Sequence, residues 1–226
     1  MKSKIYNKIS IWVALLILTA IGITISSILV GQSFLRVYPL YVSLFIMLLM
    51  SNVNRYAYLI GGLNAISYGF IYLYYDIPGS AISAFLFSFP LQIISFIRWS
   101  KASWKNTTVL KKMSSKVKAF NVVLVVCVWV IYYALIRYLG SASSLIDSMA
   151  SLIGMYITIL QVLKYSEYTI LMIPSGLLSI SLYISLIVQG NTEQITFLIY
   201  SVYSLVCVIR SVFNARKILK EQKQIP

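Results

Sequence analysis

Residues 9–30 read ISIWVALLILTAIGITISSILV, an apolar run without a charged residue. A helix of ~20 such residues crosses the ~30 Å hydrocarbon core of a bilayer. The run follows the basic start MKSKIYNK, as the apolar region of a signal peptide would. It is too long for such a region, however, and no small-residue cleavage pattern ends it cleanly. We therefore expect residues 9–30 to form the first retained transmembrane helix.

The composition of the whole chain favours the same class. Of 226 residues, 60% are hydrophobic and 11% are charged, whereas soluble domains carry roughly 25% charged residues. Mean hydropathy is +0.86. A soluble fold of this size cannot hide so much apolar surface. The net charge of +14 does not indicate nucleic-acid binding, because the basic residues cluster between the apolar runs, where cytoplasmic loops of membrane proteins carry them.

The apolar runs predict an all-α polytopic membrane protein with eight transmembrane helices and no soluble domain. Residues 1–226 form a single transmembrane domain in this interpretation. It contains an extra N-terminal helix, a first group of three helices, a basic cytoplasmic loop, a linking helix, a second group of three helices and a basic cytoplasmic tail. Their expected bounds are 9–30, then 37–99 (37–53, 56–75 and 80–99), 100–119, 120–139, 144–213 (144–163, 168–188 and 194–213) and 214–226.

The distribution of Lys and Arg predicts the orientation. With the N-terminus inside and eight crossings, 16 of the 19 basic residues fall on the cytoplasmic side, and Arg210 can snorkel to that side. Only Arg36 and Arg137 fall outside, as do the acids Asp76, Asp147 and Glu193. So one-sided a split follows the positive-inside rule. We expect a multi-pass protein of the bacterial cell (inner) membrane with both termini cytoplasmic.

Residues 37–99 and 144–213 resemble each other. Aligning Tyr56 with Tyr168 brings Asn64 opposite Gly176 and Ser67 opposite Ser179. Three helices begin and end on opposite sides of the membrane, and the one linking helix restores the starting side, so the two groups run parallel. Parallel three-helix repeats are a transporter architecture with the substrate bound between the halves.

Polar residues follow one face of the predicted helix 80–99, which reads SAISAFLFSFPLQIISFIRW. Ala84, Ser88, Gln92, Ser95 and Trp99 are spaced by three or four residues and share that face. A mid-membrane Gln facing lipid is costly, so Gln92 must face protein or a water-filled cavity. Pro90, two residues earlier, can bend the helix. The alternative is that these residues only pack and bond helix to helix.

Other polar residues in the apolar helices add candidates for the same cavity. Asn64 lies in the predicted helix 56–75, Ser179 and Tyr183 in 168–188, and Tyr203 in 194–213. Tyrosines offer a flat face and a hydroxyl to a planar ligand, although tyrosines near helix ends also serve as interfacial anchors. The chain has no His, and Cys127 and Cys207 lie in apolar runs, so no metal site, cofactor or disulfide is expected. Without a paired catalytic constellation, we do not expect an enzyme.

Three segments of the sequence carry a family resemblance. They are RYAYLIGGLNAISYGFIYLYYDIPGSAISAFLFSFPLQIISFIRWSK (residues 55–101), SLIDSMASLIGMY (144–156) and LKYSEY (163–168). Together they resemble the nicotinamide riboside transporter family (PnuC), over roughly residues 38–217. The resemblance implies a SWEET-like bundle of 3+1+3 helices, facilitated uptake of a vitamin-like compound and trapping of that compound by a cytoplasmic kinase. Gln92 and Trp99 carry over directly.

The sequence departs from the family pattern at several positions of ligand type. Where the family has Asn, Trp, Trp, Asn, Asn, Gly and Trp, this chain has Ala84, Thr169, Met172, Gly176, Val206, Arg210 and Asn214. The resemblance therefore implies the fold more directly than the substrate, which can be nicotinamide riboside, thiamine or another vitamin or nucleoside precursor.

The leading hypothesis is thus a transporter that works by facilitated diffusion of a small vitamin-like metabolite. The residues expected to bind the substrate are Gln92, Asn64, Ser88, Trp99, Ser179, Tyr183 and Tyr203. The expected partners are the substrate, the lipid bilayer and, through its product, a cytoplasmic kinase, with no nucleic acid. A homo-oligomer stays open, and so does ion coupling. The alternative is a membrane-embedded binding or immunity protein without transport activity.

Overall fold

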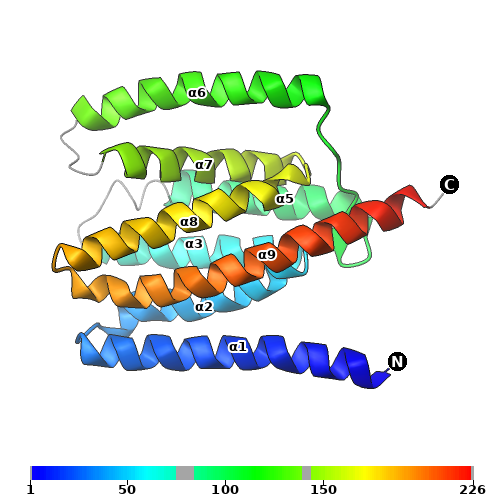
Figure 1. Ribbon diagram of the computed structural model, residues 1–226. Coiled ribbons are helices and arrows are strands. Elements are labelled where there is room, and N and C mark those ends of the chain that lie inside the picture. The colour runs from blue at the N-terminus through cyan, green and yellow to red at the C-terminus, as the bar shows by residue number, and fades with distance from the viewer. Residues whose placement is uncertain (1, 75–83, 139–143, 225–226) are drawn as a thin grey trace.

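A computed structural model describes residues 2–74, 84–138 and 144–224 and shows a bundle of long helices (Figure 1). Eight α-helices lie within the described residues, and a π-helical turn, η1, runs directly into one of them. In chain order the elements are α1 (Lys2–Leu29), α2 (Phe34–Ser51), α3 (Tyr56–Tyr74), η1 (Ala84–Ser88), α5 (Phe89–Lys101), β1 (Ser103–Trp104), β2 (Thr107–Thr108), α6 (Ser115–Tyr138), α7 (Ser144–Val162), α8 (Glu167–Val188), η2 (Thr192–Gln194) and α9 (Ile195–Lys223).

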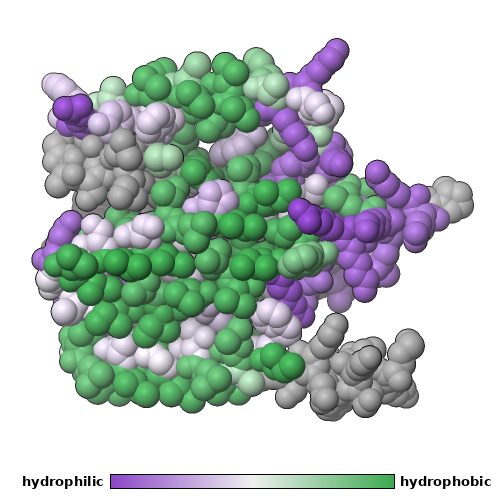
Figure 2. Space-filling model, viewed as in Figure 1, coloured by the Kyte–Doolittle hydropathy of each residue, from purple (hydrophilic) through white to green (hydrophobic). Residues whose placement is uncertain are grey.

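The surface of the bundle is that of a membrane protein. Four of the described helices, α1, α2, α8 and α9, are long and apolar enough to cross a membrane, and α7 contributes a shorter apolar stretch, Leu152–Val162. Large apolar side chains point outward, with Leu29 79% exposed and Ile131 71% exposed. Figure 2 shows apolar residues over the length of the helices, most of the hydrophilic residues at one end and a few at the other. Water would not tolerate so much contiguous apolar surface, whereas lipid requires it.

Most of the predicted helices coincide with observed ones, and three of them extend beyond the predicted bounds by five residues or more. The described helix α1 already begins at Lys2 rather than at residue 9, α6 begins at Ser115 rather than at 120, and α9 continues to Lys223 rather than ending at 213. Each extension is rich in Lys, Gln or Glu, which favour helix and are soluble in water. The 29 residues of α9 span ~43 Å, more than the ~30 Å apolar core needs. The predicted helix start at 80–83 lies outside the described residues.

The packing of the helices places α9 at the centre. Helix α9 contacts α8, α2 and α1; α3 contacts α2 and α5; and α7 contacts α8, α5 and α6. Helices α1 and α6 lie at opposite edges of the bundle, and both termini lie at the same end (Figure 1). Two apolar cores hold the bundle together: one around Trp99 and Tyr168, the other where α1, α2 and α9 meet at Ile23, Leu44 and Cys207.

Two helices end in the same kind of turn. Val53 after α2 and Lys164 after α7 both have the left-handed backbone, with φ of 54° and 64°. The next residue donates its N–H across the turn in each case, Asn54 to the Leu49 carbonyl (3.1 Å) and Tyr165 to the Leu160 carbonyl (3.0 Å). This is the Schellman arrangement that satisfies the last carbonyls of a helix. The two turns lie 111 residues apart, one fewer than the alignment of Tyr56 with Tyr168 requires.

The predicted basic loop 100–119 is an ordered connection. Strands β1 and β2 form a short antiparallel hairpin, with Ser103 paired to Thr108. Lys111 then exchanges backbone hydrogen bonds with the turn between α7 and α8, donating to Lys164 (2.8 Å) and accepting from Ser166 (2.9 Å). The Gln222 carboxamide of α9 accepts from the Leu110 N–H and donates to the Thr108 carbonyl. The helical part of the predicted tail 214–226 is therefore hydrogen-bonded to this connection.

Candidate functional site

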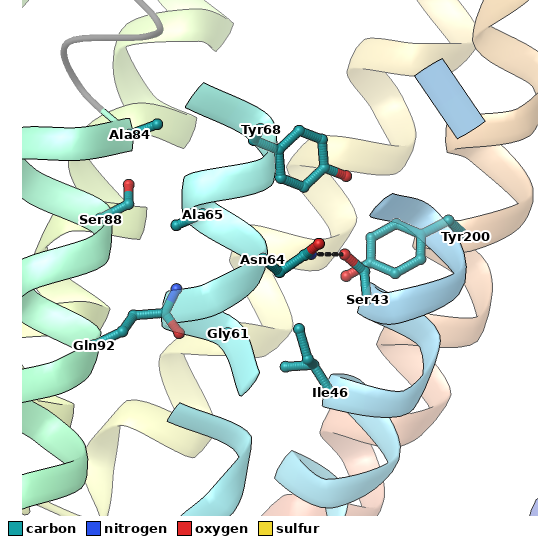
Figure 3. Close-up of a pocket in the computed structure, with 10 residues that line it drawn as sticks. All are labelled: Ser43, Ile46, Gly61, Asn64, Ala65, Tyr68, Ala84, Ser88, Gln92 and Tyr200. Carbon is teal, nitrogen blue, oxygen red and sulfur yellow. Dashed lines mark hydrogen bonds between the residues drawn. The ribbon is translucent and has the colours of Figure 1, made fainter. Parts of the chain in front are cut away.

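A cavity of about 400 Å³ lies between α2, α3, η1, α5 and α9. This volume is within the ~300–1,000 Å³ typical of small-molecule sites. Its lining mixes small, aromatic and uncharged polar residues, shown in Figure 3: Ser43, Ile46, Gly61, Asn64, Ala65, Tyr68, Ala84, Ser88, Gln92 and Tyr200. None of these lining residues is charged, so the cavity suits a ligand recognised by hydrogen bonds and ring contacts.

Glycines of α3 allow η1 and α5, which form the opposite wall of the cavity, to pack close to α3. A Cβ on Gly61 would overlap the Gln92 carboxamide, and one on Gly69 would lie 2.5 Å from the Phe85 ring. Gly61, Ala65 and Gly69 are four residues apart and share one face of α3. Small residues on one face let two membrane helices pack at close range. The Gln92 side chain therefore lies directly on the backbone of α3, beside Asn64 on the next turn.

The π-helical turn η1 sets the direction of Ser88 and Ala84. Pro90, in the first turn of α5, has no N–H to donate to the carbonyl one turn earlier, and its ring crowds that carbonyl. A wider π-helical turn relieves both problems, and such turns recur at functional sites. The expected bend at Pro90 is therefore realised as η1, which ends at Ser88, the residue that faces the cavity in Figure 3.

Asn64 is the most informative residue of the cavity. It is only 5% exposed, and its Nδ2 donates to the Ser43 Oγ (3.0 Å) and to the Pro39 carbonyl (3.3 Å). These two bonds fix the orientation of the amide. Its Oδ1 is buried and accepts no hydrogen bond within the described part of the chain. A buried acceptor without a donor costs ~1–3 kcal/mol, so an N–H or O–H that reached Asn64 Oδ1 would relieve this cost.

Gln92 and Ser88 supply further polar atoms from the opposite wall. Across the described residues, neither side chain has a hydrogen-bond partner, and both are half-buried. In Figure 3 the Gln92 carboxamide points toward the space between α5 and α3. An amide offers a donor and an acceptor together, which suits a ligand carrying the same pair of groups.

Tyr200 of α9 separates this cavity from a second one. The second cavity, of about 280 Å³, lies between α7, α8 and α9 and also has Tyr200 in its wall. Its other polar lining residues come mostly from α8 and α9: Ser175, Ser179, Tyr183, Ser201 and Ser204. The Tyr183 ring stacks on Phe197 (5.7 Å between centroids), and the Ser179 Oγ donates to the Ser175 carbonyl (3.1 Å).

The structure thus divides the seven predicted binding residues among three places. Asn64, Ser88 and Gln92 line the first cavity, and Ser179 and Tyr183 line the second.

Trp99 and Tyr203 line neither cavity. Trp99 is fully buried between Tyr58 (4.7 Å) and Tyr168 (6.1 Å), and its Nε1 donates to the Gln161 carbonyl (2.7 Å). Tyr203 is 3% exposed and donates to the Leu44 carbonyl (3.1 Å). In this structure both side chains hold helices together.

Sequence reasoning did not select Ser43 and Tyr200 as binding residues. Ser43 is a lone polar residue in the middle of α2, a signal that is indistinguishable from a packing serine in sequence. Tyr200 was one of two tyrosines three residues apart on the same helix, and only the packing of α9 against α2 and α8 distinguishes it from Tyr203. The side chain of Asp147, predicted to lie near the outer end of its helix, is outside the described residues.

The residues that depart from the family pattern have local explanations at two positions. Arg210 lies over the ring of Trp12 in the extra helix α1, with 4.2 Å from Cζ to the ring centroid. Such a contact stabilises a cation in apolar surroundings. The Asn214 Nδ2 donates to the Ser51 carbonyl at the end of α2 (2.7 Å). No group of three or more His, Cys, Asp or Glu that could hold a metal occurs in the described residues.

Comparisons with known proteins agree with this architecture. A solved structure described as the crystal structure of the vitamin B3 transporter PnuC superposes with a TM-score of 0.75 at 19% sequence identity, covering 93% of this chain and 90% of that one. That likeness shows a shared fold. No curated protein sequence matches the chain. The family model described as nicotinamide mononucleotide transporter matches residues 33–213, which include α2 to α8 and most of α9. The chain therefore belongs to the nicotinamide mononucleotide transporter family of multi-pass membrane proteins.

Proposed function

We propose that this protein transports nicotinamide riboside, or a closely related nucleoside or vitamin precursor, by facilitated diffusion. The family and the shared fold support a membrane transporter of vitamin B3 compounds. The observation that carries the substrate class is the uncharged cavity, with the buried, unpaired acceptor of Asn64 in its wall.

The chemistry of the lining favours the riboside over the mononucleotide. A mononucleotide carries a phosphate, which proteins bind with Arg, Lys or helix N-termini. The first cavity has no Lys or Arg in its lining. A nicotinamide riboside has a carboxamide, a sugar with hydroxyl donors and a positively charged ring. Asn64 Oδ1 and Gln92 can bond its carboxamide or sugar, and the rings of Tyr68 and Tyr200 can receive its cationic ring.

The proposed architecture is a 3+1+3 SWEET-like bundle, with α2, α3 and η1–α5 as the first group and α7, α8 and α9 as the second. Two observations support it. Contacts between the groups are reciprocal, because the first helix of each group packs on the last helix of the other, α2 on α9 and α7 on α5. The matched turns at Val53 and Lys164 also follow the first helix of each group. Helix α6 is then the linking helix, and rocking of the groups alternates access to the substrate.

In this proposal the end of the bundle that carries both termini is cytoplasmic. Hydrophilic residues, mostly basic, gather at that end in Figure 2, as the positive-inside rule requires. Uptake by facilitated diffusion stops when the substrate reaches electrochemical equilibrium, so a cytoplasmic kinase that phosphorylates the substrate would sustain the inward flow.

Uptake into vesicles tests the proposal. Protein reconstituted in liposomes, with the membrane potential held at zero, should equilibrate radiolabelled nicotinamide riboside at the same final level with or without a proton or sodium gradient. Unlabelled nicotinamide riboside should compete, whereas the mononucleotide should compete weakly. A final level that rises with a gradient would assign ion coupling. Binding without any uptake, in liposomes shown to be sealed, would favour the alternative of a binding or immunity protein.

A further inference from the structure

A second kind of site lies at the end of the bundle that carries both termini (Figure 1). A cavity of about 450 Å³ opens there between the connection to α6, the start of α8 and the end of α9. Five of its nine lining residues are cationic and one is acidic: Lys112, Lys118, Ser166, Glu167, Ile170, Arg216, Leu219, Lys220 and Lys223. The uncharged cavity proposed for the substrate uses none of these residues.

The single carboxylate does not neutralise this cluster. Glu167 accepts the Met113 N–H (3.0 Å) and pairs with Lys118 (3.0 Å), so it is occupied by the connection to α6. Within the described part of the chain, the other four cations have no acidic partner. These four side chains are exposed: Lys112, Arg216, Lys220 and Lys223. Their mutual repulsion favours a bound anion.

The basic cavity continues into an apolar groove between α6, α7 and α8. This groove has a volume of about 370 Å³ and shares Lys118, Glu167 and Ile170 with the basic cavity. Its remaining walls are almost wholly apolar and include Val122, Val125, Val126, Ile153, Leu160 and Leu171. The groove exists because α6 packs mainly on α7 among the described helices, so it does not close onto α8. From Lys118 to Val126 it follows α6 for ~12 Å, most of the ~15 Å depth of one leaflet.

We propose that this composite site binds one anionic phospholipid. Its phosphate lies among Lys112, Arg216 and Lys220, and one acyl chain lies in the groove beside Val125. Basic pockets between helices on the cytoplasmic side suit acidic headgroups, and each Lys or Arg near the surface adds attraction. A soluble anion would occupy only the basic cavity. A phospholipid has a headgroup for the basic cavity and an acyl chain for the apolar groove that continues from it. The bound lipid fills the gap that separates α6 from α8.

Native mass spectrometry of the purified full-length protein tests this proposal. The probes are phosphatidylglycerol, phosphatidylcholine with the same acyl chains, and inorganic phosphate. We expect phosphatidylglycerol to bind at least about tenfold more tightly than phosphatidylcholine, because two to four cations contribute attraction to the headgroup. Equal binding of the two lipids would overturn the proposal. Protection by inorganic phosphate equal to that by phosphatidylglycerol, read by thermal unfolding, would assign a soluble-anion site and overturn it as well.

Two variants and a matched control locate the lipid. The double change Arg216→Gln and Lys220→Gln should weaken phosphatidylglycerol binding about 10- to 30-fold. Arg98→Gln with Lys101→Gln removes the same charges from exposed positions outside the cavity and should leave binding within about twofold. Val125→Trp fills the groove and should weaken binding of the lipid. Elution as a monodisperse peak establishes that each variant is folded. Equal loss in the pocket and control variants, or none with Val125→Trp, would refute the assignment.

Discussion

Replacing Asn64 by Leu separates a binding role from a packing role. Leu has the same branching and the same number of side-chain heavy atoms as Asn, so the α2–α3 contact is kept. The change removes two hydrogen bonds, to Ser43 and to the Pro39 carbonyl, together with the unpaired Oδ1. Loss of the two hydrogen bonds lowers stability, whereas loss of the unpaired Oδ1 raises it. For a ligand, in contrast, the change removes the whole amide group that it would contact.

The magnitudes follow from these atoms. Two neutral hydrogen bonds contribute ~0.5–1.5 kcal/mol each, and relief of a buried unpaired acceptor returns ~1–3 kcal/mol. The net change in the free energy of unfolding should therefore be within about 2 kcal/mol in either direction. A ligand loses its hydrogen bond to a buried acceptor, worth ~1–3 kcal/mol, so its Kd should rise about 5- to 150-fold.

Calorimetric titration of nicotinamide riboside and thermal unfolding of the same purified samples measure both quantities. Ser95→Ala is a matched control, because the Ser95 Oγ is likewise buried and unpaired in the described structure but lies outside both cavities. The control should keep its Kd. The reasoning is refuted if Asn64→Leu melts far below the wild type while its Kd is unchanged, since Asn64 would then only pack helices.

Further predictions concern the cavity wall, the core and one basic turn. Gln92→Ala should reduce uptake strongly without lowering the amount of protein in the membrane, and normal uptake would assign Gln92 to packing. Gly61→Ala should push the Gln92 carboxamide away and also lower uptake, whereas Gly22→Ala, where a Cβ makes only an ordinary contact with Ile199 (3.6 Å), should not. Trp99→Phe should destabilise the fold by ~1–3 kcal/mol through the lost bond to Gln161 and a smaller ring, with the Kd for the substrate unchanged. Burial and the nearby charges of Lys111 and Arg98 lower the pKa of Lys164 in the folded protein. The unfolded chain therefore binds the Lys164 proton more tightly than the folded protein does. Because of this, the free energy of unfolding rises with pH until the pH passes the unfolded pKa of ~10.4. Lys164→Asn, which tolerates the left-handed backbone, should raise Tm at pH 7.5, and the advantage should shrink toward pH 10.

The places where helices end illustrate the limits of reasoning from hydropathy. Residues 214–223 are polar and were expected to be a tail, yet they continue α9, because Gln222 and Glu221 bond to the connection before α6. The connection in turn is ordered by partners more than 50 residues away, at Lys164 and Glu167. Sequence patterns report local preference and burial, so contacts between such distant segments are invisible to them.

By itself, the sequence determined that this chain is a multi-pass helical membrane protein, where most of its helices lie, and that Asn64, Ser88 and Gln92 face the protein interior. Those conclusions follow from the cost of polar groups in lipid, which acts on each helix separately. Only the tertiary structure decided that these three share one cavity, that Tyr200 lies between two cavities, and that Trp99 and Tyr203 belong to the packing. A polar helix face becomes a cavity wall or a packing contact only when helices that are separate in sequence pack together. In this protein the glycines of α3 and the π-helical turn before Pro90 determine how closely those helices approach.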